Sequence, residues 1–379
     1  MRFSRSLRIC VCLFLAVASG LVGIAGQTAG QGTGQGAPPA AQTAVQAPGQ
    51  TPPGAVPPAP GSGSPEGRIH LDVVVSDKAG KAISGLELRD FTLLDNNLPS
   101  KIVSFHAVDD PMQKATPVQA ILVLDAINQE SSAVSAERVQ VDTFPRQNGG
   151  RLPLPVSVLL FNDAGLKVLA NPSLDGNAVA AQLDKADAGF RMITRAAGAY
   201  GAIDLLTRSL DGFNSLTTAE SGKPGRKLII WIGPGWPLLD NPSFQTSNSG
   251  QQKLFESIVR MSASLREAHI SVYDVADGLP GARTNLYQYF LKGVNSAQKA
   301  ALANLSVKVL AVESGGLVLG PNNDLSSQIA TCVQDGVPYY TVSFDPPRAD
   351  KPNEFHDLKV QIGKPGLTAR TRTGYYDQP

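Results

Sequence analysis

The hydrophobic pattern of the chain changes twice, and the changes divide it into three parts. Between residues 68 and 105, and again between residues 339 and 372, apolar and polar residues alternate in short runs, as in half-buried strands. From Thr116 to Val337, continuous apolar runs alternate with stretches in which apolar residues recur at helical spacing. The pattern predicts β structure at both ends and an α/β domain between them.

Four apolar runs in the middle part are predicted to be strands of a mainly parallel sheet with helices on both faces. The runs are Gln119–Leu124, Val156–Phe161, Lys227–Ile232 and Ile270–Val275. This is a Rossmann-like arrangement, in which ligands bind at the carboxyl ends of the strands.

Three helices are indicated by the periodicity of the same part. The first carries Leu254, Ile258, Met261 and Leu265, and the second carries Leu302, Leu305 and Val309 and ends at Gly315-Gly316. We expect Asn322-Asn323-Asp324 to cap the third, which runs from Leu325 to Val333.

The alternating runs at either end of the chain are too few to form a core alone. They are Arg68–Asp77, Asp90–Asp95 and Ile102–Phe105 at one end, and Tyr339–Phe344, Asp357–Ile362 and Leu367–Arg372 at the other. We infer one small β-sandwich-like module formed by residues 67–115 and 338–379, with the α/β domain, residues 116–337, inserted between its halves.

The first 66 residues have the composition of an export signal and a linker. Arg2, Arg5 and Arg8 precede an apolar run, and small residues at Ala25-Gly26 offer a cleavage point, so residues 1–26 are predicted to be a signal peptide. The alternative is an uncleaved membrane anchor. Residues 27–66 are rich in Gln, Gly, Pro and Ala, which predicts a disordered linker, either a spacer or a passive leader.

Charge and cysteine content narrow the class of protein further. The net charge of +1 gives no indication of a nucleic-acid partner. Cys10 and Cys12 lie inside the predicted signal, so the mature chain would keep only Cys332 and could form no internal disulfide. Cys332 lies in an apolar helical pattern, and we expect a buried thiol rather than a nucleophile.

Candidate binding residues follow two of the predicted strands. Asp125 ends the first strand, and Asn128 and Gln129 lie in the loop after it. Gly233-Pro-Gly-Trp236 follows a later strand and would bring Trp236 beside Asp125 and Asn128. Two alternatives stay open for Trp236: an exposed anchor for a protein or sugar, or packing over the sheet end with Leu238 and Leu239.

An ordered set of short motifs accompanies these residues. They are Leu124-Asp125, the run Gly225–Pro237, Val272-Tyr-Asp274, Glu313-Ser-Gly-Gly316, Tyr339-Tyr340 and Arg372-Thr-Gly-Tyr-Tyr376. With this set the chain, from about Arg68 to Tyr376, resembles the von Willebrand factor A (vWA)-related proteins abundant in Acidobacteria. The resemblance implies a vWA-like sheet in a secreted protein.

The resemblance also bears on metal binding, because vWA domains hold a divalent cation with Asp-x-Ser-x-Ser, a Thr and a second Asp. Asp125 matches the first ligand, whereas Ile127 and Gln129 replace the two hydroxyls. Tyr200 aligns with the Thr and Pro234 with the second Asp. We therefore expect no cofactor, and expect Asp125 to accept hydrogen bonds from backbone amides instead.

A magnesium site would need other oxygen ligands and a different alignment of the loops. The side chains that could supply such oxygens are Asn128, Gln129, Thr194 and Asp240. In that case Asp125 would be the anchoring ligand.

No enzyme motif is present in the sequence. The four histidines, His70, His106, His269 and His356, lack metal-ligand spacing, and no phosphate loop, nucleophile elbow or dinucleotide fingerprint occurs. The sequence favours a non-enzymatic secreted or envelope protein that binds an unidentified protein partner or mediates adhesion, with no membrane insertion of the mature chain. The alternatives are a structural component of the cell envelope and, as the remainder, a hydrolase built on the β module.

Overall fold

The computed structural model describes residues 67–112, 116–186, 198–239, 247–275 and 285–379. The predicted signal peptide and linker lie outside these ranges, as do Thr194 and Asp240. Within the described ranges, no helix is long and apolar enough to cross a membrane.

The middle of the chain folds into a six-stranded sheet in which only the last strand pair is antiparallel. In spatial order its strands are β10 (Val318–Leu319), β9 (Ile270–Val275), β8 (Arg226–Ile232), β5 (Val118–Asp125), β6 (Arg151–Asn162) and β7 (Gly165–Asp175). Numbered along the domain, this is the doubly wound order 3-2-1-4-5-6 in reverse. The predicted mainly parallel sheet is confirmed.

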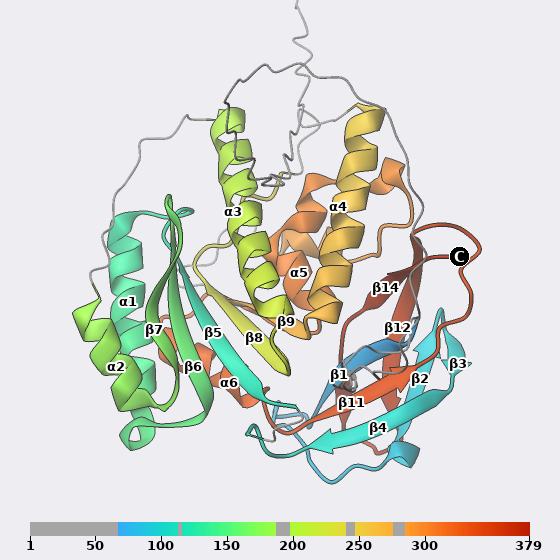
Figure 1. Ribbon diagram of the computed structural model, residues 1–379, viewed down its shortest axis with the longest axis horizontal. Coiled ribbons are helices and arrows are strands. Elements are labelled where there is room, and N and C mark those ends of the chain that lie inside the picture. The colour runs from blue at the N-terminus through green and yellow to red at the C-terminus, as the bar shows by residue number, and fades with distance from the viewer. Residues whose placement is uncertain (1–66, 113–115, 187–197, 240–246, 276–284) are drawn as a thin grey trace, which may run out of the picture. The chain divides into compact units, whose positions relative to one another are not determined.

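Helices cover both faces of this sheet (Figure 1). One face packs against α1 (Ser131–Arg146), α2 (Gly176–Lys185) and α6 (Leu325–Gln334), whose apolar side chains share a core with alternate residues of the strands. The other carries α3 (Gly198–Ser221), α4 (Asn248–Glu267) and α5 (Val307–Glu313). Cys332 of α6 is fully buried, and burial raises the pKa of its thiol, as expected of an inert core cysteine.

The predicted helices α4 and α6 are confirmed, and Asp324 caps α6 by accepting a hydrogen bond from the Ser327 N–H at 3.0 Å. The helix expected through Leu302 and Val309 is instead divided at Ser306. A short turn, η6 (Leu302–Leu305), precedes it, and α5 begins after it because the Ser306 hydroxyl accepts from the Val309 N–H at 3.4 Å. The remaining short turns are η1 (Leu88–Asp90), η2 (Gln147–Gly150), η4 (Leu286–Phe290) and η5 (Ala297–Lys299).

The two ends of the chain form two four-stranded antiparallel sheets, ordered β13-β1-β11-β4 and β14-β12-β2-β3. The strands are β1 (Ile69–Ser76), β2 (Phe91–Asp95), β3 (Leu98–Ser100), β4 (Ile102–Val108), β11 (Tyr339–Phe344), β12 (Glu354–Ile362), β13 (Thr368–Arg370) and β14 (Gly374–Asp377). Ile69 lies opposite Phe344, and apolar side chains from both ends share one core. The predicted β-sandwich-like module built from both ends is confirmed.

Candidate functional site

Asp125 lies at the carboxyl end of β5 and is completely buried. One carboxylate oxygen, Oδ1, accepts from the backbone N–H groups of Ile127 at 3.0 Å and Asn128 at 3.1 Å. The other, Oδ2, accepts from Asn128 Nδ2 at 2.7 Å and Trp231 Nε1 at 2.8 Å. Burial raises the pKa of Asp125, while these N–H donors act in the opposite direction.

The loop after β5 is held by further polar contacts. Gln129 Nε2 donates to the backbone oxygen of Asp125 at 2.7 Å and to Oε2 of Glu137, on α1, at 2.6 Å. Asn128 Nδ2 also donates to Ser209 Oγ on α3 at 3.0 Å. The three predicted residues Asp125, Asn128 and Gln129 therefore meet, and they fix the loop to α1, α3 and β8.

Ser209 and Glu137 belong to this network but were not predicted from the sequence. Ser209 lies on the buried side of α3, three residues after Leu206 and four before Phe213, both buried. A polar residue on the apolar face of a helix was the available signal. The packing of α3 on the sheet decides which loop Ser209 contacts. No local sequence pattern predicts this packing.

The described polar contacts of the Asp125 carboxylate are all made with N–H donors. Both carboxylate oxygens face N–H donors, whereas a hard cation needs oxygen ligands pointing at it. Ile127 is buried, Tyr200 is 62% exposed, and Pro234 offers no side-chain ligand. Among the described residues, no group of three or more His, Cys, Asp or Glu side chains could hold a metal ion.

Trp236 is packed into the protein rather than exposed, with 5% of its surface accessible. Its ring centroid lies 5.2 Å from that of Trp231 and 5.3 Å from that of Phe213, both in edge-on geometry. The structure thus places Trp236 beside the Trp231 ring that donates to Asp125, but inside the aromatic layer under α3. Of the two alternatives for Trp236, the structure shows packing, although its ring partners are Trp231 and Phe213.

The turn that carries Trp236 also passes close to a second buried carboxylate, that of Asp274 on β9. Lys308 Nζ donates to Asp274 Oδ2 at 2.5 Å; burial raises the pKa of Asp274, and Lys308 opposes this. Gly235 has φ +81°, and a Cβ there would lie 3.4 Å from Asp274 Oδ1. A Cβ at Gly233 would lie 3.1 Å from Asp125 Cβ. The glycines of Gly233-Pro-Gly-Trp236 thus let the backbone pass close over both carboxylates.

Two tyrosine side chains that lie at the carboxyl ends of the strands, or follow them in the sequence, are exposed. Tyr200, in the first turn of α3, is 62% exposed, and Tyr289, in the segment that follows the carboxyl end of β9, is 80% exposed. Because α3 runs back toward the start of β8, its first turn lies at the carboxyl ends of the strands. In Figure 1, α3 and α4 extend beyond the sheet at this end.

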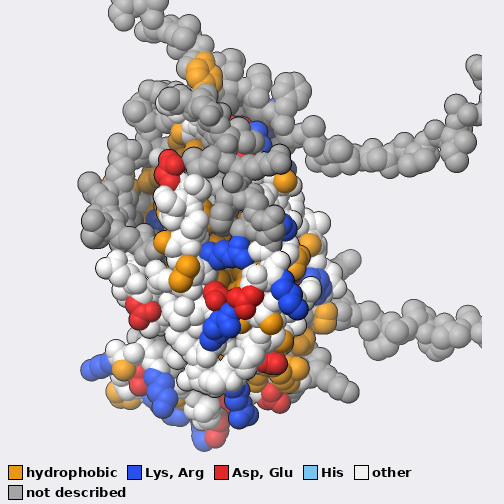
Figure 2. Space-filling model, turned by 90° about the vertical axis from the view of Figure 1, so that its left-hand side faces the viewer, with side chains coloured by type: hydrophobic (Ala, Val, Ile, Leu, Met, Phe, Trp, Pro, Cys, Tyr) orange, Lys and Arg blue, Asp and Glu red, His pale blue; other side chains and the backbone are white. Residues whose placement is uncertain are grey.

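The side of the molecule with α1, α2 and β7 has a different surface. Acidic and basic side chains are intermixed there, and neither sign of charge dominates (Figure 2). Arg146 of α1, for example, pairs with Asp142 at 3.1 Å and with Asp184 of α2 at 2.8 Å. This side has the mixed charge of an ordinary solvated surface.

Comparisons with known proteins add limited information. No protein-family model and no curated protein sequence matches the chain. Among solved structures, the human COPII-coat protein Sec24c is similar at a TM-score of 0.30 and 11% identity, over 72% of this chain and 46% of that one. The SpRpn10 VWA domain is similar at a TM-score of 0.28 and 13% identity, over 58% of this chain and 95% of that one.

A third similar structure is the pilus adhesin RrgA from Streptococcus pneumoniae, with a TM-score of 0.22 and 13% identity over 49% of this chain and 28% of that one. This chain thus spans less than half of the Sec24c and RrgA chains. The fold assignment rests on the sheet itself: the doubly wound strand order with one antiparallel edge strand defines a vWA-like α/β domain, inserted in a β-sandwich.

Proposed function

We propose that the protein is a secreted, non-enzymatic, vWA-like module that binds a protein partner through the carboxyl ends of its strands without a metal ion. The observation that carries the proposal is the exposure of Tyr200 and Tyr289 on segments at or following these strand ends. Exposed tyrosines supply large contact areas and a hydroxyl, and they are enriched where proteins bind one another.

The Asp125 network supports a role for this end that does not depend on metal. Four N–H groups donate to the buried carboxylate, so the loop after β5 is held in place by the chain itself. A rigid loop packed against the middle of α3 would form part of a preformed surface for a partner. Export is part of the proposal and rests on the pattern of residues 1–26.

The test is capture of envelope or extracellular proteins by the immobilised chain, in the presence of either magnesium or a chelator. We expect one partner to be retained equally in both, and its capture to fall at least about tenfold with the double variant Tyr200→Ala/Tyr289→Ala, a loss of about 1.4 kcal/mol. Because both side chains are exposed, the variant should keep the thermal midpoint of the parent protein.

Leu98→Ala is the matched control, since Leu98 is 70% exposed but lies on β3 of the β-sandwich. If the tyrosine double variant still captures the partner, the proposed surface is not the binding site. Capture that needs magnesium, together with magnesium binding in calorimetry, would instead restore a metal-dependent adhesion site at Asp125.

A further inference from the structure

Each of the three described sheets ends in two edge strands, which present backbone N–H and C=O groups without a partner strand. Four of these edge strands are short: β10 has 2 residues, β3 and β13 have 3 each, and β14 has 4. The edge strand β7 is longer, but Pro172 lies within it and its pairing with β6 contains register shifts. Short length, proline and bulges are means by which proteins prevent edge-to-edge pairing.

The remaining edge strand, β4 of the β-sandwich, is less protected. It has 7 residues, from Ile102 to Val108, and contains no proline. In the described part of the chain it pairs only with β11, and this pairing is regular from Ser104 to Val108, with one register shift beyond Ser104. Most of its residues are exposed, namely Val103, Ser104, His106 and Ala107.

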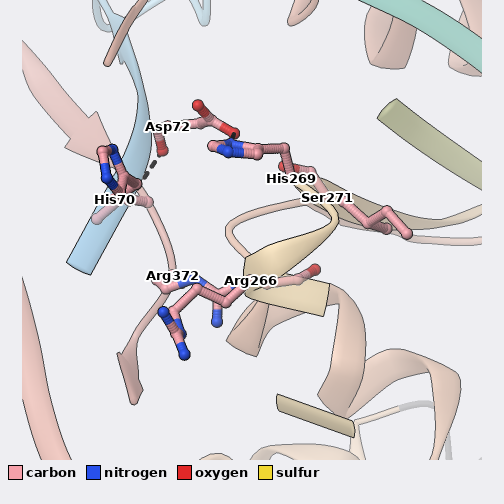
Figure 3. A pocket seen from close by; sticks show the side chains of 9 residues that line it. His70, Asp72, Arg266, His269, Ser271 and Arg372 are labelled. Carbon is pink, nitrogen blue, oxygen red and sulfur yellow. Dashed lines mark hydrogen bonds and ion pairs between the residues drawn. The ribbon is translucent and has the colours of Figure 1, made fainter. Parts of the chain in front are cut away.

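Both faces of the sheet that contains β4 make contacts within the molecule. One face shares an apolar core with the second sheet of the sandwich. On the other, His70 and Asp72 of β1 meet the α/β domain around a small polar cavity (Figure 3). His269 Nδ1 lies 3.3 Å from Asp72 Oδ2 there, and the cavity volume of about 10 Å³ leaves room for at most one water molecule. The edge at β4, by contrast, has no neighbouring strand on its outer side.

Two residues of opposite charge flank β4. Lys101 precedes the strand and Asp109 follows it, and both are exposed. Within the described ranges, neither forms an ion pair with another residue of the chain. Each lies four positions from Phe105, so the two charges are placed symmetrically about this residue. Such a strand is complementary to an antiparallel copy of itself, because each charge meets its opposite.

The backbone of β4 is compatible with the same symmetry. In an antiparallel ladder, only alternate residues direct their N–H and C=O groups toward a given neighbour. A two-fold axis at Phe105 pairs residues whose numbers differ by an even count, so the outward-directed residues of one copy meet those of the other. The same register places Lys101 of one copy opposite Asp109 of the other, at both ends of the strand pair.

We propose that β4 pairs with β4 of a second copy of this chain, antiparallel and centred on Phe105, to form a homodimer. The two four-stranded sheets would join into one continuous sheet through an interface that uses the same surface of both copies. Main-chain hydrogen bonds would supply affinity, and the contacts between Lys101 and Asp109 would fix the register. The dimer would carry two copies of the partner surface proposed above, which lies on the α/β domain.

Sedimentation equilibrium of the purified protein from about 1 to about 100 µM tests this proposal, with a reversible monomer–dimer equilibrium as the expected result. Lys101→Glu and Asp109→Lys each bring like charges together at both ends, and each should weaken the dimer at least about tenfold. The double variant restores opposite charges and should recover the affinity of the parent protein. A parent protein that stays monomeric, or a double variant that dimerises no better than the single variants, would overturn the proposal.

A second variant tests the edge itself. Val103→Lys places a charge on β4, which is a common means of blocking edge association, and it should abolish the dimer. Val103 is 43% exposed, so the circular dichroism spectrum should not change. Val168→Lys is the matched control, since Val168 is 56% exposed on the edge strand β7, and it should dimerise like the parent protein. A dimer that persists in Val103→Lys, or is lost in Val168→Lys, would contradict pairing through β4.

Discussion

Two carboxyl groups in this protein, one completely buried and one only partly exposed, are held in different environments. Burial raises the pKa of Asp125, and four N–H donors around its carboxylate oppose that rise because they favour the charged form. Glu313, at the end of α5, lacks such donors among the described contacts, and burial raises its pKa to about 8, with Arg372 acting in the opposite direction. The first residue is a fixed anchor for a loop, whereas the second is expected to change charge near neutral pH.

The change Glu313→Gln should therefore alter the pH dependence of stability. A raised folded pKa means that the folded state holds a proton which the unfolded state releases above about pH 4.5, so the free energy of unfolding falls as pH rises toward 8. Glutamine cannot ionise, so relative to the parent protein the variant should gain stability between pH 5 and pH 8, by at most about 1.4 kcal/mol per pH unit.

Urea denaturation of both proteins across this range measures the difference, and the pairwise comparison cancels the titration of His70 and His269. Glu130→Gln is the control, because Glu130 is exposed and makes no capping hydrogen bond. A Glu313→Gln curve parallel to that of the parent protein would contradict the raised pKa.

The sequence was sufficient to identify Asp125, Asn128 and Gln129 as one cluster, because all three lie at the end of one strand or in the loop directly after it. The sequence could not predict whether Trp236 is buried or exposed. The glycines of the turn after β8 allow the ring to point either inward or outward. The pairing of His269 with Asp72 was also out of reach: 197 residues separate them, and the two lie in different parts of the fold.

At the scale of elements, continuous apolar runs proved to be the reliable signal. Strand β9 has the predicted ends, and β5 and β8 extend the predicted runs by one or two residues. Strand β7 was missed because its exposed and buried residues follow no simple period, and its pairing with β6 contains register shifts. The break at Ser306 was missed because a serine fits both a helix interior and a cap.

Gly316 shows how closely α5 and β9 approach each other. A Cβ at this position would lie 1.6 Å from the backbone oxygen of Val272, while the Gly316 N–H donates to the Ala311 oxygen at 2.8 Å. Neither backbone can withdraw without breaking its own hydrogen bonds. Gly316 is thus required because its backbone and that of Val272 lie too close together for a side chain.

Gly316→Ala should destabilise the protein by about 1–3 kcal/mol or more, because the added methyl group forces α5 away from β9. Urea denaturation is the measurement. Gly320→Ala is the matched control, since a Cβ at Gly320 meets nothing within 4 Å, and it should change the free energy of unfolding by less than about 0.5 kcal/mol. Equal stability of the two variants would contradict the close approach.

At the scale of the whole described molecule, the β-sandwich and the α/β domain share apolar core. Val74, Val108 and Tyr339 of the sandwich strands belong to the same buried cluster as Leu122 and Cys332. An ion pair reinforces the junction: Arg370 of β13 pairs with the carboxylate of Asp335 in the α/β domain. Asp335 is held in turn by Arg226, at the start of β8, whose Nη1 donates to the Asp335 backbone oxygen at 2.6 Å. Neither part is expected to keep its structure when the other is lost.

The protein should consequently unfold in one transition. Scanning calorimetry is expected to give a single peak whose calorimetric and van't Hoff enthalpies agree. A chain ending at residue 347, which lacks β12, β13 and β14, should lose the α/β domain as well as the sandwich, with far-ultraviolet circular dichroism as the readout. Two separate peaks, or a folded α/β domain in the shortened chain, would show that the parts are independent.

The pairing of Ile69 with Phe344 has a consequence for how the chain is made. All six strands of the inserted sheet lie between residues 118 and 319, so they are all synthesised before β11 and β13. Strand β1 emerges first but must remain without its neighbours β11 and β13 until nearly the whole chain has been synthesised. During that interval an apolar strand is open to association with other chains, so the first of the described strands to be translated is the one most in need of protection by a chaperone.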